Sequence, residues 1–430
     1  MCLRSSIEKV EGRAVDGSWD FKGANTKYST HGFHGYPAMM IPQIARRLIE
    51  ENGEDSKVLL DPFMGSGTAL VEAKLHPQFE RAYGIDVNPL ALLIARVKTT
   101  PLDYELLRQT FNEIMQLSRD GIQELRFELK EVEKPCFFNI DYWFKPHVID
   151  EISIIKGSID STLEGRKREL RDFFYVVLSD TIRRCSNARN GEYKLYRLDG
   201  KRLSSHYPSP IKEFEAKSVY NMDRMRQFEE SSYGCEVRIL NEDSRAKTSI
   251  EDESVDILLT SPPYGDSQTT VSYGQFSRLS LQWMGYEKDK ANIDKISLGG
   301  QRVPDRDLLE SPTLKRVFEE IARKDQKRAD KVLDFYLDFY RCVEEFDRVM
   351  RAGSKLCFVV GNRTVKSLNI PTDTIVVELF KQRDEGYRHI KTIGRNIPSK
   401  RLPRKSSPTN VKGSVVNTMS QEHIVILEKH

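Results

Sequence analysis

Two short polar loops hold the residue types that could carry out chemistry, and each directly follows an apolar run of the sequence. The first loop is DPFMGSGT, residues 61–68, and the second is TSPPY, residues 260–264. Two glycines in the first loop let the backbone approach a ligand closely, and the helix expected after them offers free N–H groups to polar ligand atoms. The first loop therefore predicts a site for a nucleotide-like cofactor. Its candidate binding residues are Asp61, Pro62, Phe63, Gly65, Gly67 and Thr68.

The second loop is stiffened by two consecutive prolines, which fix an extended backbone and remove two N–H donors. The carbonyl groups of Ser261 and Pro262 can then accept hydrogen bonds, and Tyr264 offers a flat ring. These features suit the binding of an exocyclic amino group while a planar base stacks on the tyrosine. A proline-stiffened structural turn is the alternative, and the presence of the glycine loop disfavours it. The candidate catalytic residues are Ser261, Pro262, Pro263 and Tyr264.

Two carboxylates follow apolar runs of the same kind. Asp86 lies about twenty residues after the glycine loop, where an acidic side chain accepts hydrogen bonds from ribose hydroxyls. Asp243 ends the strand expected at 236–245 and could meet the base of the same ligand. Leu70 stands where a dinucleotide-binding G-x-G-x-x-G loop needs its third glycine, which disfavours a dinucleotide.

The elements that must position these residues follow an alternating pattern. Five apolar runs are expected as strands: 57–68, 81–89, 236–245, 254–264 and 354–363. Because amphipathic helices lie between them, the sequence predicts an α/β fold with a mostly parallel sheet that is covered on both faces. Ligands on such a sheet bind at the carboxyl ends of the strands, where both loops fall.

Three segments depart from this alternation. The pattern at 101–234 is largely helical and predicts an inserted helical subdomain, which separates the catalytic segments 20–100 and 235–430. A charged insertion is expected at 286–330, and an extended basic loop at 395–413.

Taken in order, DPFMGSGT, Asp86 and TSPPY resemble the amino-group DNA methyltransferases, which use S-adenosylmethionine. The segment His34-Gly35-Tyr36-Pro37-Ala38 looks like the N-terminal cofactor motif of that family, H-x-Y-P-A. The resemblance implies a Rossmann-like class I methyltransferase fold with a mostly parallel seven-stranded sheet and a helical insertion. It also implies that Tyr36 and Pro37 join the cofactor site, that Asp86 binds the ribose and that Asp243 lies near the adenine.

The identity of the target base is also implied by the resemblance. In this family a serine that opens the catalytic loop is associated with N4-cytosine targets, and an aspartate with N6-adenine targets. Ser261 therefore favours methylation of cytosine N4 in DNA, in restriction–modification or phage defence, with adenine N6 as the alternative. Further alternatives are an RNA base or protein-glutamine methyltransferase, a catalytically silent DNA-recognition subunit and an NAD oxidoreductase.

Contact with double-stranded DNA must come from local charge, because 67 basic and 64 acidic residues leave a net charge of only +3. Phosphate contacts position a protein on DNA, and a paired base must be flipped out to reach a catalytic cleft. Two basic segments, 166–202 and 395–405, are the candidates. The candidate DNA-binding residues are Arg166, Lys167, Arg183, Arg184, Arg189, Lys400, Arg401 and Arg404. A cognate restriction endonuclease or defence-system subunit is a further expected partner.

The composition excludes several other classes of protein. Twenty Phe and 17 Tyr among 430 residues are enough for a packed core, which excludes global disorder. No apolar run approaches the roughly 20 residues of a membrane span, and the first residues lack the apolar stretch of a signal peptide. The six cysteines form no C-x-x-C pair and the eight histidines show no ligand spacing. We therefore expect no metal and a location in the reducing cytoplasm.

Overall fold

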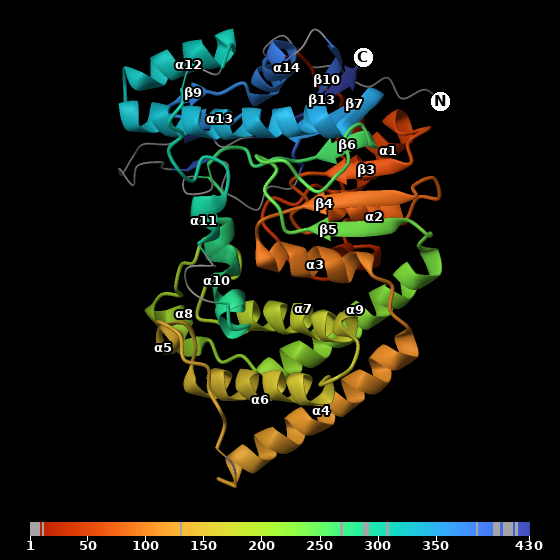
Figure 1. The fold of residues 1–430 in the computed structure, drawn as a ribbon. Coiled ribbons are helices and arrows are strands. Elements are labelled where there is room, and N and C mark those ends of the chain that lie inside the picture. Colours follow the sequence, from red (N-terminus) through yellow and green to blue (C-terminus); the bar gives the residue numbers. More distant parts are fainter. Residues whose placement is uncertain are drawn as a thin grey trace.

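The computed structural model describes residues 9–10, 13–129, 131–266, 270–286, 292–306, 309–383, 386–398, 405–406, 416–417 and 420–430. A seven-stranded sheet in the order β10-β13-β7-β6-β3-β4-β5 forms the centre of the upper half (Figure 1). Its strands are β3 (Val58–Asp61), β4 (Arg81–Ile85), β5 (Glu236–Leu240), β6 (Val255–Thr260), β7 (Met350–Val360), β10 (Tyr387–Asn396) and β13 (Gln421–Lys429).

The direction of the strands decides where their loops meet. β5, β4, β3, β6 and β7 pair in parallel, and β13 is antiparallel to both β7 and β10. Since β3 and β6 are parallel neighbours, the loops at their carboxyl ends leave the sheet side by side. The predicted α/β fold of the Rossmann-like class I methyltransferase type, with a mostly parallel seven-stranded sheet, is confirmed.

Alternate residues of each central strand build two separate cores. Leu59 and Ile257 pack with α1 (Pro42–Asn52) and α2 (Thr68–Lys74) on one face of the sheet. Leu60 and Leu258, one position later, pack on the other face. The helices on that face are α12 (Pro312–Ala322), α13 (Gln326–Val349) and α14 (Thr372–Arg383). Apolar residues at every position of a strand are typical of a parallel sheet that is covered on both faces.

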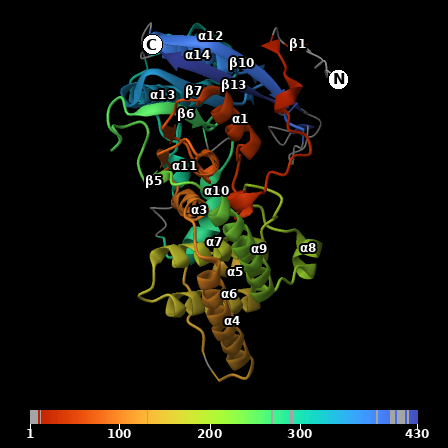
Figure 2. The same ribbon diagram turned by 90° about the vertical axis from the view of Figure 1, so that its right-hand side faces the viewer.

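A layer of helices lies below the sheet in Figures 1 and 2 and is inserted between α3 (Pro89–Thr99) and β5. Its helices are α4 (Tyr104–Arg126), α5 (Ile140–Trp143), α6 (Pro146–Thr162), α7 (Arg168–Cys185), α8 (Gly200–Ser205) and α9 (Pro210–Ser231). These helices share a third core with α3 and with α10 (Tyr273–Trp283). The division into domains at 101 and 234 stays a prediction.

The remaining elements are short. They are the 3-10 turns η1 (Gly17–Trp19) and η2 (Ser29–Gly32), the helix α11 (Ile293–Ile296), and the ribbons β1–β2 (Lys9–Val10, Arg13–Ala14), β8–β9 (Thr364–Val365, Leu368–Asn369) and β11–β12 (Lys405–Ser406, Val416–Asn417).

The prediction of an extended loop at 395–413 is wrong for its first two residues. Arg395 and Asn396 end β10, where they pair with Glu422 and Gln421 of β13. Among the residues that the structure describes, no helix is long and apolar enough to cross a membrane.

Candidate active site

The glycine loop after β3 adopts a backbone that most side chains would prevent. Gly65 and Gly67 have φ angles of 50° and 77°, in the left-handed region that favours glycine. A Cβ atom on Gly67 would also lie 3.0 Å from the Cβ atom of Ala95 on α3. The two glycines therefore allow a sharp turn that leads directly into α2, so the start of that helix faces the same side as the loop.

Asp86 fixes this loop from the neighbouring strand. Its carboxylate accepts hydrogen bonds from the backbone N–H of Gly65 at 3.0 Å and from that of Asn88 at 2.8 Å. Burial raises the pKa of Asp86 to about 6. The carboxylate that the sequence assigns to the cofactor thus also sets the shape of the glycine loop.

Asp61 joins the two loops to each other. Its carboxylate accepts a hydrogen bond from the Thr260 hydroxyl at 2.6 Å and another from the Phe63 N–H at 3.2 Å. Burial raises the pKa of Asp61 to about 7. Because Thr260 directly precedes Ser261, Asp61 fixes the point at which the second loop leaves β6.

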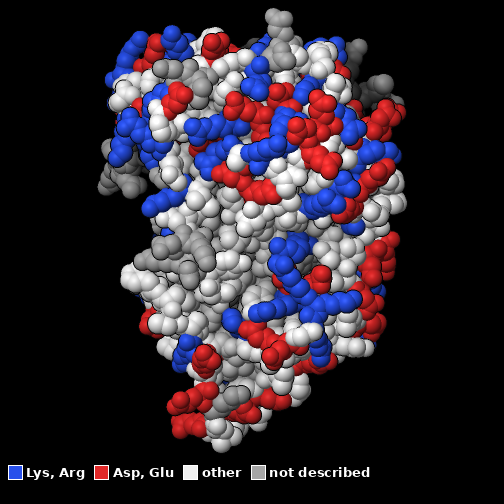
Figure 3. All heavy atoms as spheres, in the orientation of Figure 1, with Lys and Arg blue, Asp and Glu red and all other residues white. Residues whose placement is uncertain are grey.

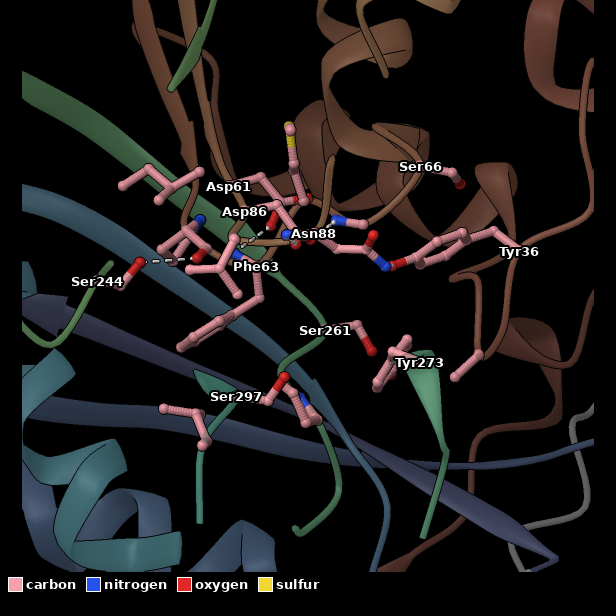
Figure 4. Close-up of a pocket in the computed structure, with 18 of the residues that line it drawn as sticks. Tyr36, Asp61, Phe63, Ser66, Asp86, Asn88, Ser244, Ser261, Tyr273 and Ser297 are labelled. Carbon is pink, nitrogen blue, oxygen red and sulfur yellow. Dashed lines mark hydrogen bonds between the residues drawn. The ribbon is translucent and has the colours of Figure 1, made fainter. Parts of the chain in front are cut away.

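One pocket brings most of the predicted site together. Figure 4 shows Ser261 and Tyr273 on one side of this pocket and Asp86 and Phe63 on the other. The predicted residues that line it are Tyr36, Pro37, Asp61, Pro62, Phe63, Gly65, Thr68, Asp86, Asp243, Ser261 and Pro263. Gly67, Pro262 and Tyr264 belong to the same two loops but do not line the pocket.

The pocket also contains residues that the sequence did not single out individually, although Tyr273 lies in the segment 268–278, which the sequence predicts to fold over the target base or the cofactor. Asn88 donates to the Tyr36 hydroxyl at 2.8 Å and to the Ser277 hydroxyl at 2.9 Å, and Tyr273 stacks on Tyr36. The Asn-Pro pair at 88–89, a signal for the start of a helix, could have drawn attention to Asn88. The additional lining residues are Ala38, Met39, Met40, Met64, Ser66, Ile85, Val87, Asn88, Glu242, Ser244, Arg245, Tyr273, Ile293, Ile296, Ser297 and Leu298.

Asp243 lines the pocket and also forms an ion pair with a neighbouring arginine. Arg245 donates to both of its carboxylate oxygens, with contacts of 2.6 to 3.1 Å. Arg245 also donates to Asp338 at 2.9 Å and to the carbonyl of Ile296 at 2.7 Å. The predicted adenine-side carboxylate is thereby connected to the segment 293–298, which closes one side of the pocket.

In the second loop, Tyr264 contacts strand β13. Its hydroxyl donates to Glu422 at 3.0 Å, and the Ser261 hydroxyl lies 3.4 Å from it. Burial and the nearby Glu422 carboxylate raise the pKa of Tyr264 well above its ordinary value. The stacking of this ring on a target base stays a prediction.

A buried group of charged side chains lies behind the glycine loop. Lys98, only 1% exposed, donates to the carbonyl of Ser66 at 2.8 Å, and burial lowers its pKa to about 7. Glu72 accepts hydrogen bonds from Tyr28, from His31 at 2.7 Å and from Arg46 at 2.9 Å. Lys98 thus holds the backbone of the loop at Ser66, and Glu72 connects α2 to the segment 28–46.

The motif residue His34 does not line the pocket. Its Nε2 atom lies 2.9 Å from the Ser179 hydroxyl on α7, and its Nδ1 atom lies 2.5 Å from the carbonyl of Gly35. Burial lowers the pKa of His34 to about 4. The histidine therefore anchors the chain just before Tyr36 and Pro37 to the helical layer.

The basic residues predicted to contact DNA do not form one patch. Arg166 and Lys167 are exposed at the start of α7, whereas Arg183, Arg184 and Arg189 lie at its other end, about 25 Å away along an 18-residue helix. The segment that follows α7 contacts α10, because the Leu195 N–H donates to Gln275 at 3.2 Å.

Four of these arginines interact with other residues of the protein. Arg183 lies over the Phe276 ring at 3.8 Å and donates to the Phe276 carbonyl at 3.0 Å, a position that favours a structural role. The other three form ion pairs: Arg166 with Glu113, Arg184 with Asp180 and Arg189 with Glu192. Lys400, Arg401 and Arg404 lie outside the described residues.

No group of three or more His, Cys, Asp or Glu that could hold a metal ion is present within the described ranges.

Three curated proteins and one family model resemble the chain. A family model described as DNA methylase, of the N6/N4 type, matches residues 4–96. The type II methyltransferase M.MvaI of Kocuria varians is 42% identical over 95% of this chain and 93% of its own length. M.MjaII of Methanocaldococcus jannaschii is 30% identical over 34% of this chain and 27% of its own length. M.BsoBI of Geobacillus stearothermophilus is 24% identical over 62% and 55%, respectively.

Proposed function

The chain belongs to the N4/N6 family of type II DNA methyltransferases, and on that basis we propose that it methylates the exocyclic N4 atom of cytosine in double-stranded DNA, with S-adenosylmethionine as the methyl donor. One observation carries the proposal: a single pocket is lined by Gly65 and Asp86 together with Ser261 and Pro263. A nucleotide-type site and a loop suited to an amino group thus share one space. Ser261 at the start of that loop supports cytosine over adenine.

The residues of the pocket fit S-adenosylmethionine. The Asp86 carboxylate would accept hydrogen bonds from the ribose hydroxyls, and N–H groups of the glycine loop and the start of α2 would hold the carboxylate of the methionine part. Phe63 and Tyr36 would provide apolar surface on either side. When bound, the cofactor supplies an electrophilic methyl group on a sulfonium centre.

The protein must make a poor nucleophile reactive. The lone pair of the cytosine amino nitrogen is delocalised into the ring, and hydrogen bonds to the Pro262 carbonyl and to Ser261 would favour a tetrahedral nitrogen. Its lone pair would then point toward the methyl group. Proximity and preorganised polar groups supply most of the acceleration, and the reaction needs no cysteine nucleophile.

We propose that DNA lies along the side of the helical layer near α10. Tyr142, Tyr196 and Tyr207 are exposed there by 45%, 48% and 74%, and Arg197 lies over the Tyr142 ring at 4.2 Å. Exposed aromatic rings and nearby cations are typical of surfaces that bind nucleic acids. On the face shown in Figure 3, lysines and arginines, with acidic residues among them, lie above α10 over α12 and α13.

The proposed position of the DNA predicts different roles for two arginines that the sequence analysis placed in one group. Arg189→Ala, at the α10 end of α7, should weaken DNA binding by about tenfold, because one phosphate contact is lost. Arg166→Ala, at the far end of the helix, should leave DNA affinity unchanged. Fluorescence anisotropy with a labelled duplex measures both. Equal effects of the two substitutions would contradict the placement.

The decisive experiment identifies the modified base. The protein is incubated with methyl-labelled S-adenosylmethionine and unmethylated DNA, and the DNA is digested to nucleosides. Label in N4-methylcytosine is the expected result, whereas label in N6-methyladenine would keep the mechanism and overturn the base assignment. No label in any DNA base, with cofactor binding intact, would contradict the proposed function. Protection of the labelled DNA from a cognate restriction endonuclease would test the role in restriction–modification.

A further inference from the structure

A line of hydroxyl and carboxyl groups leads from the catalytic loop to β13. The Tyr264 hydroxyl donates to the Oε1 atom of Glu422 at 3.0 Å, and the Ser261 hydroxyl lies 3.4 Å from the Tyr264 hydroxyl. A tyrosine hydroxyl has one proton to donate, and here Glu422 receives it, so Ser261 is the donor in the other contact. Each hydroxyl therefore donates in the direction of the carboxylate.

Glu422 is placed both to receive a proton and to release it. Its Oε2 atom accepts a hydrogen bond from Arg395, which lies opposite it across β10 and β13. Arg395 is 3% exposed and also donates to the carbonyl of Trp19 at 2.9 Å. The side chain of Glu422 is 17% exposed, so it reaches the buried tyrosine on one side and water on the other.

Methylation of an amino group must dispose of one proton. A bond forms between the amino nitrogen and the methyl carbon while the carbon–sulfur bond breaks, with a neutral thioether as the leaving group. The nitrogen then carries a positive charge until it loses one of its two hydrogens as a proton. Since a protonated exocyclic nitrogen on a pyrimidine is strongly acidic, a carboxylate is basic enough to take that proton.

We propose that Ser261, Tyr264 and Glu422 form the route by which this proton leaves the site. The inference rests on the proposed methylation of an amino group. The Ser261 oxygen accepts the proton from nitrogen, the original Ser261 proton passes to the Tyr264 oxygen, and the original Tyr264 proton passes to Glu422. Both hydroxyls end neutral, and Glu422 is protonated until water takes the proton. Glu422 acts here through Tyr264, as a positioning residue and as the end of the route.

The other charged and titratable groups around this line are poor acceptors. Arg395 faces Glu422 from β10 and is a cation, and Tyr273 faces Tyr264 from α10 with its own pKa raised by burial and by Asp86. Asp266, two residues after Tyr264, pairs with Arg363 at 3.3 Å. Because the pKa of Tyr264 is raised by burial and by Glu422, the tyrosine passes a proton on as a neutral hydroxyl and does not become a phenolate.

Tyr264→Phe is the first test, because it keeps the aromatic ring and the Glu422–Arg395 pair and removes only the connecting hydroxyl. Methyl transfer is measured in single turnovers at neutral pH, with cofactor and DNA saturating. We expect a rate loss of about 100-fold. Affinities for S-adenosylmethionine and for DNA, measured by anisotropy and calorimetry, should stay unchanged.

Glu422→Gln is the second test, and Glu428→Gln is its matched control. Glu428 pairs with Arg388 across the same two strands, at their other end. Thermal unfolding of both variants separates the loss of an ion pair from the loss of the proton acceptor, since removing one partner of a buried pair can lower stability. A pH-indicator dye in weakly buffered solution follows proton release, which should accompany product in the wild type and lag behind it in Glu422→Gln.

The outcomes separate this inference from the proposed function. Wild-type rates in both variants, or lower rates with proton release that still accompanies product in Glu422→Gln, would overturn the proton route and leave the methylation intact. A wild-type enzyme that methylates no DNA base would overturn the proposed function itself.

Discussion

The loop after β3 and the loop after β6 leave the sheet side by side, but different parts of each loop are held. In the first, buried side chains fix the backbone: Lys98 donates to the Ser66 carbonyl, Asp86 accepts from the Gly65 N–H, and Ser244 donates to the Pro62 carbonyl at 2.8 Å. In the second, the fixed groups are side chains: Thr260 donates to Asp61 and Tyr264 donates to Glu422.

This difference indicates a division of labour between the loops. A loop whose backbone is already fixed presents its N–H groups to a ligand without paying the entropy of ordering them. A loop whose tyrosine is fixed presents a ring and a line of hydroxyls to the substrate. We therefore expect damage around the first loop to change cofactor affinity, and damage to the second loop to change the rate of methyl transfer.

Ser261→Ala should have the largest effect and would affect the rate alone. Loss of the hydroxyl that we propose to contact the reacting amino group should lower kcat by about 100- to 1,000-fold, with cofactor affinity unchanged. Ser254→Ala, just before the other end of β6, is the control, since its hydroxyl contacts only the Glu251 carbonyl among the hydrogen bonds of the described residues. A weakened cofactor affinity in Ser261→Ala would break the comparison.

Asp86→Ala should mainly change affinity. It removes the acceptor for the Gly65 and Asn88 N–H groups and the proposed acceptor for the ribose, and should raise the Kd for S-adenosylmethionine about 100-fold. Asp256→Ala is a matched control, because Asp256 accepts from the N–H groups of Lys57 and Val58 at the opposite end of the strands, each at 2.8 Å. The control should lower stability and leave the Kd unchanged. A fall in kcat at saturating cofactor would argue against the division.

Lys98→Met should have a smaller effect on the same quantity. Without the ammonium group the Ser66 carbonyl loses its donor, and the Kd for the cofactor should rise about tenfold. Lys74→Met tests whether any lysine that holds a carbonyl has this effect, since Lys74 donates to Cys235 at 3.0 Å away from the pocket. Isothermal titration calorimetry gives the Kd of both variants. Equal Kd values would show that Lys98 has no special role in holding the loop.

His34→Gln should have the smallest effect. We expect it to change only how the stability of the protein depends on pH. Burial lowers the pKa of His34 to about 4 from an ordinary 6.5, so below pH 6.5 the unfolded chain binds more protons than the folded one. The stability contributed by neutral His34 is therefore lost as the pH falls from 6.5 toward 4. In His34→Gln the melting temperature should fall less steeply over this range, with exposed His389→Gln as the control. Parallel curves for all three proteins would exclude this contribution.

The parts of the site that the sequence could predict are those in which chemistry and chain geometry lie in one short segment. Asp86 and Ser261 directly follow a strand and Gly65 lies in the loop after one, so the alternating fold alone brings them to one edge of the sheet. Glu422 could not be predicted in this way, because its contact with Tyr264 depends on how β13 enters the sheet between β7 and β10. A polar residue in an amphipathic strand has no local signal of its partner 158 residues away.

The basic segment 166–202 shows a different limit of the sequence. Arg183 and Arg166 look alike in a charged stretch, but the helix places one against Phe276 and the other at the exposed start of α7. Helical periodicity predicts which face a residue occupies and says little about what covers that face. The segment 293–298, which lines the pocket, gave no signal because its contact with Arg245 comes entirely from tertiary packing.

The core shared by the helical layer, α3 and α10 restricts how this enzyme can evolve. α10 carries Tyr273 into the pocket, and its Phe276 and Leu279 pack into the same core as Phe173 and Val177 of α7. A mutation that changes the packing of the inserted helices would therefore also move α10 and, with it, Tyr273. If these helices were exchanged between relatives, we expect the pocket to stay intact only when the core residues of α10 are exchanged with them.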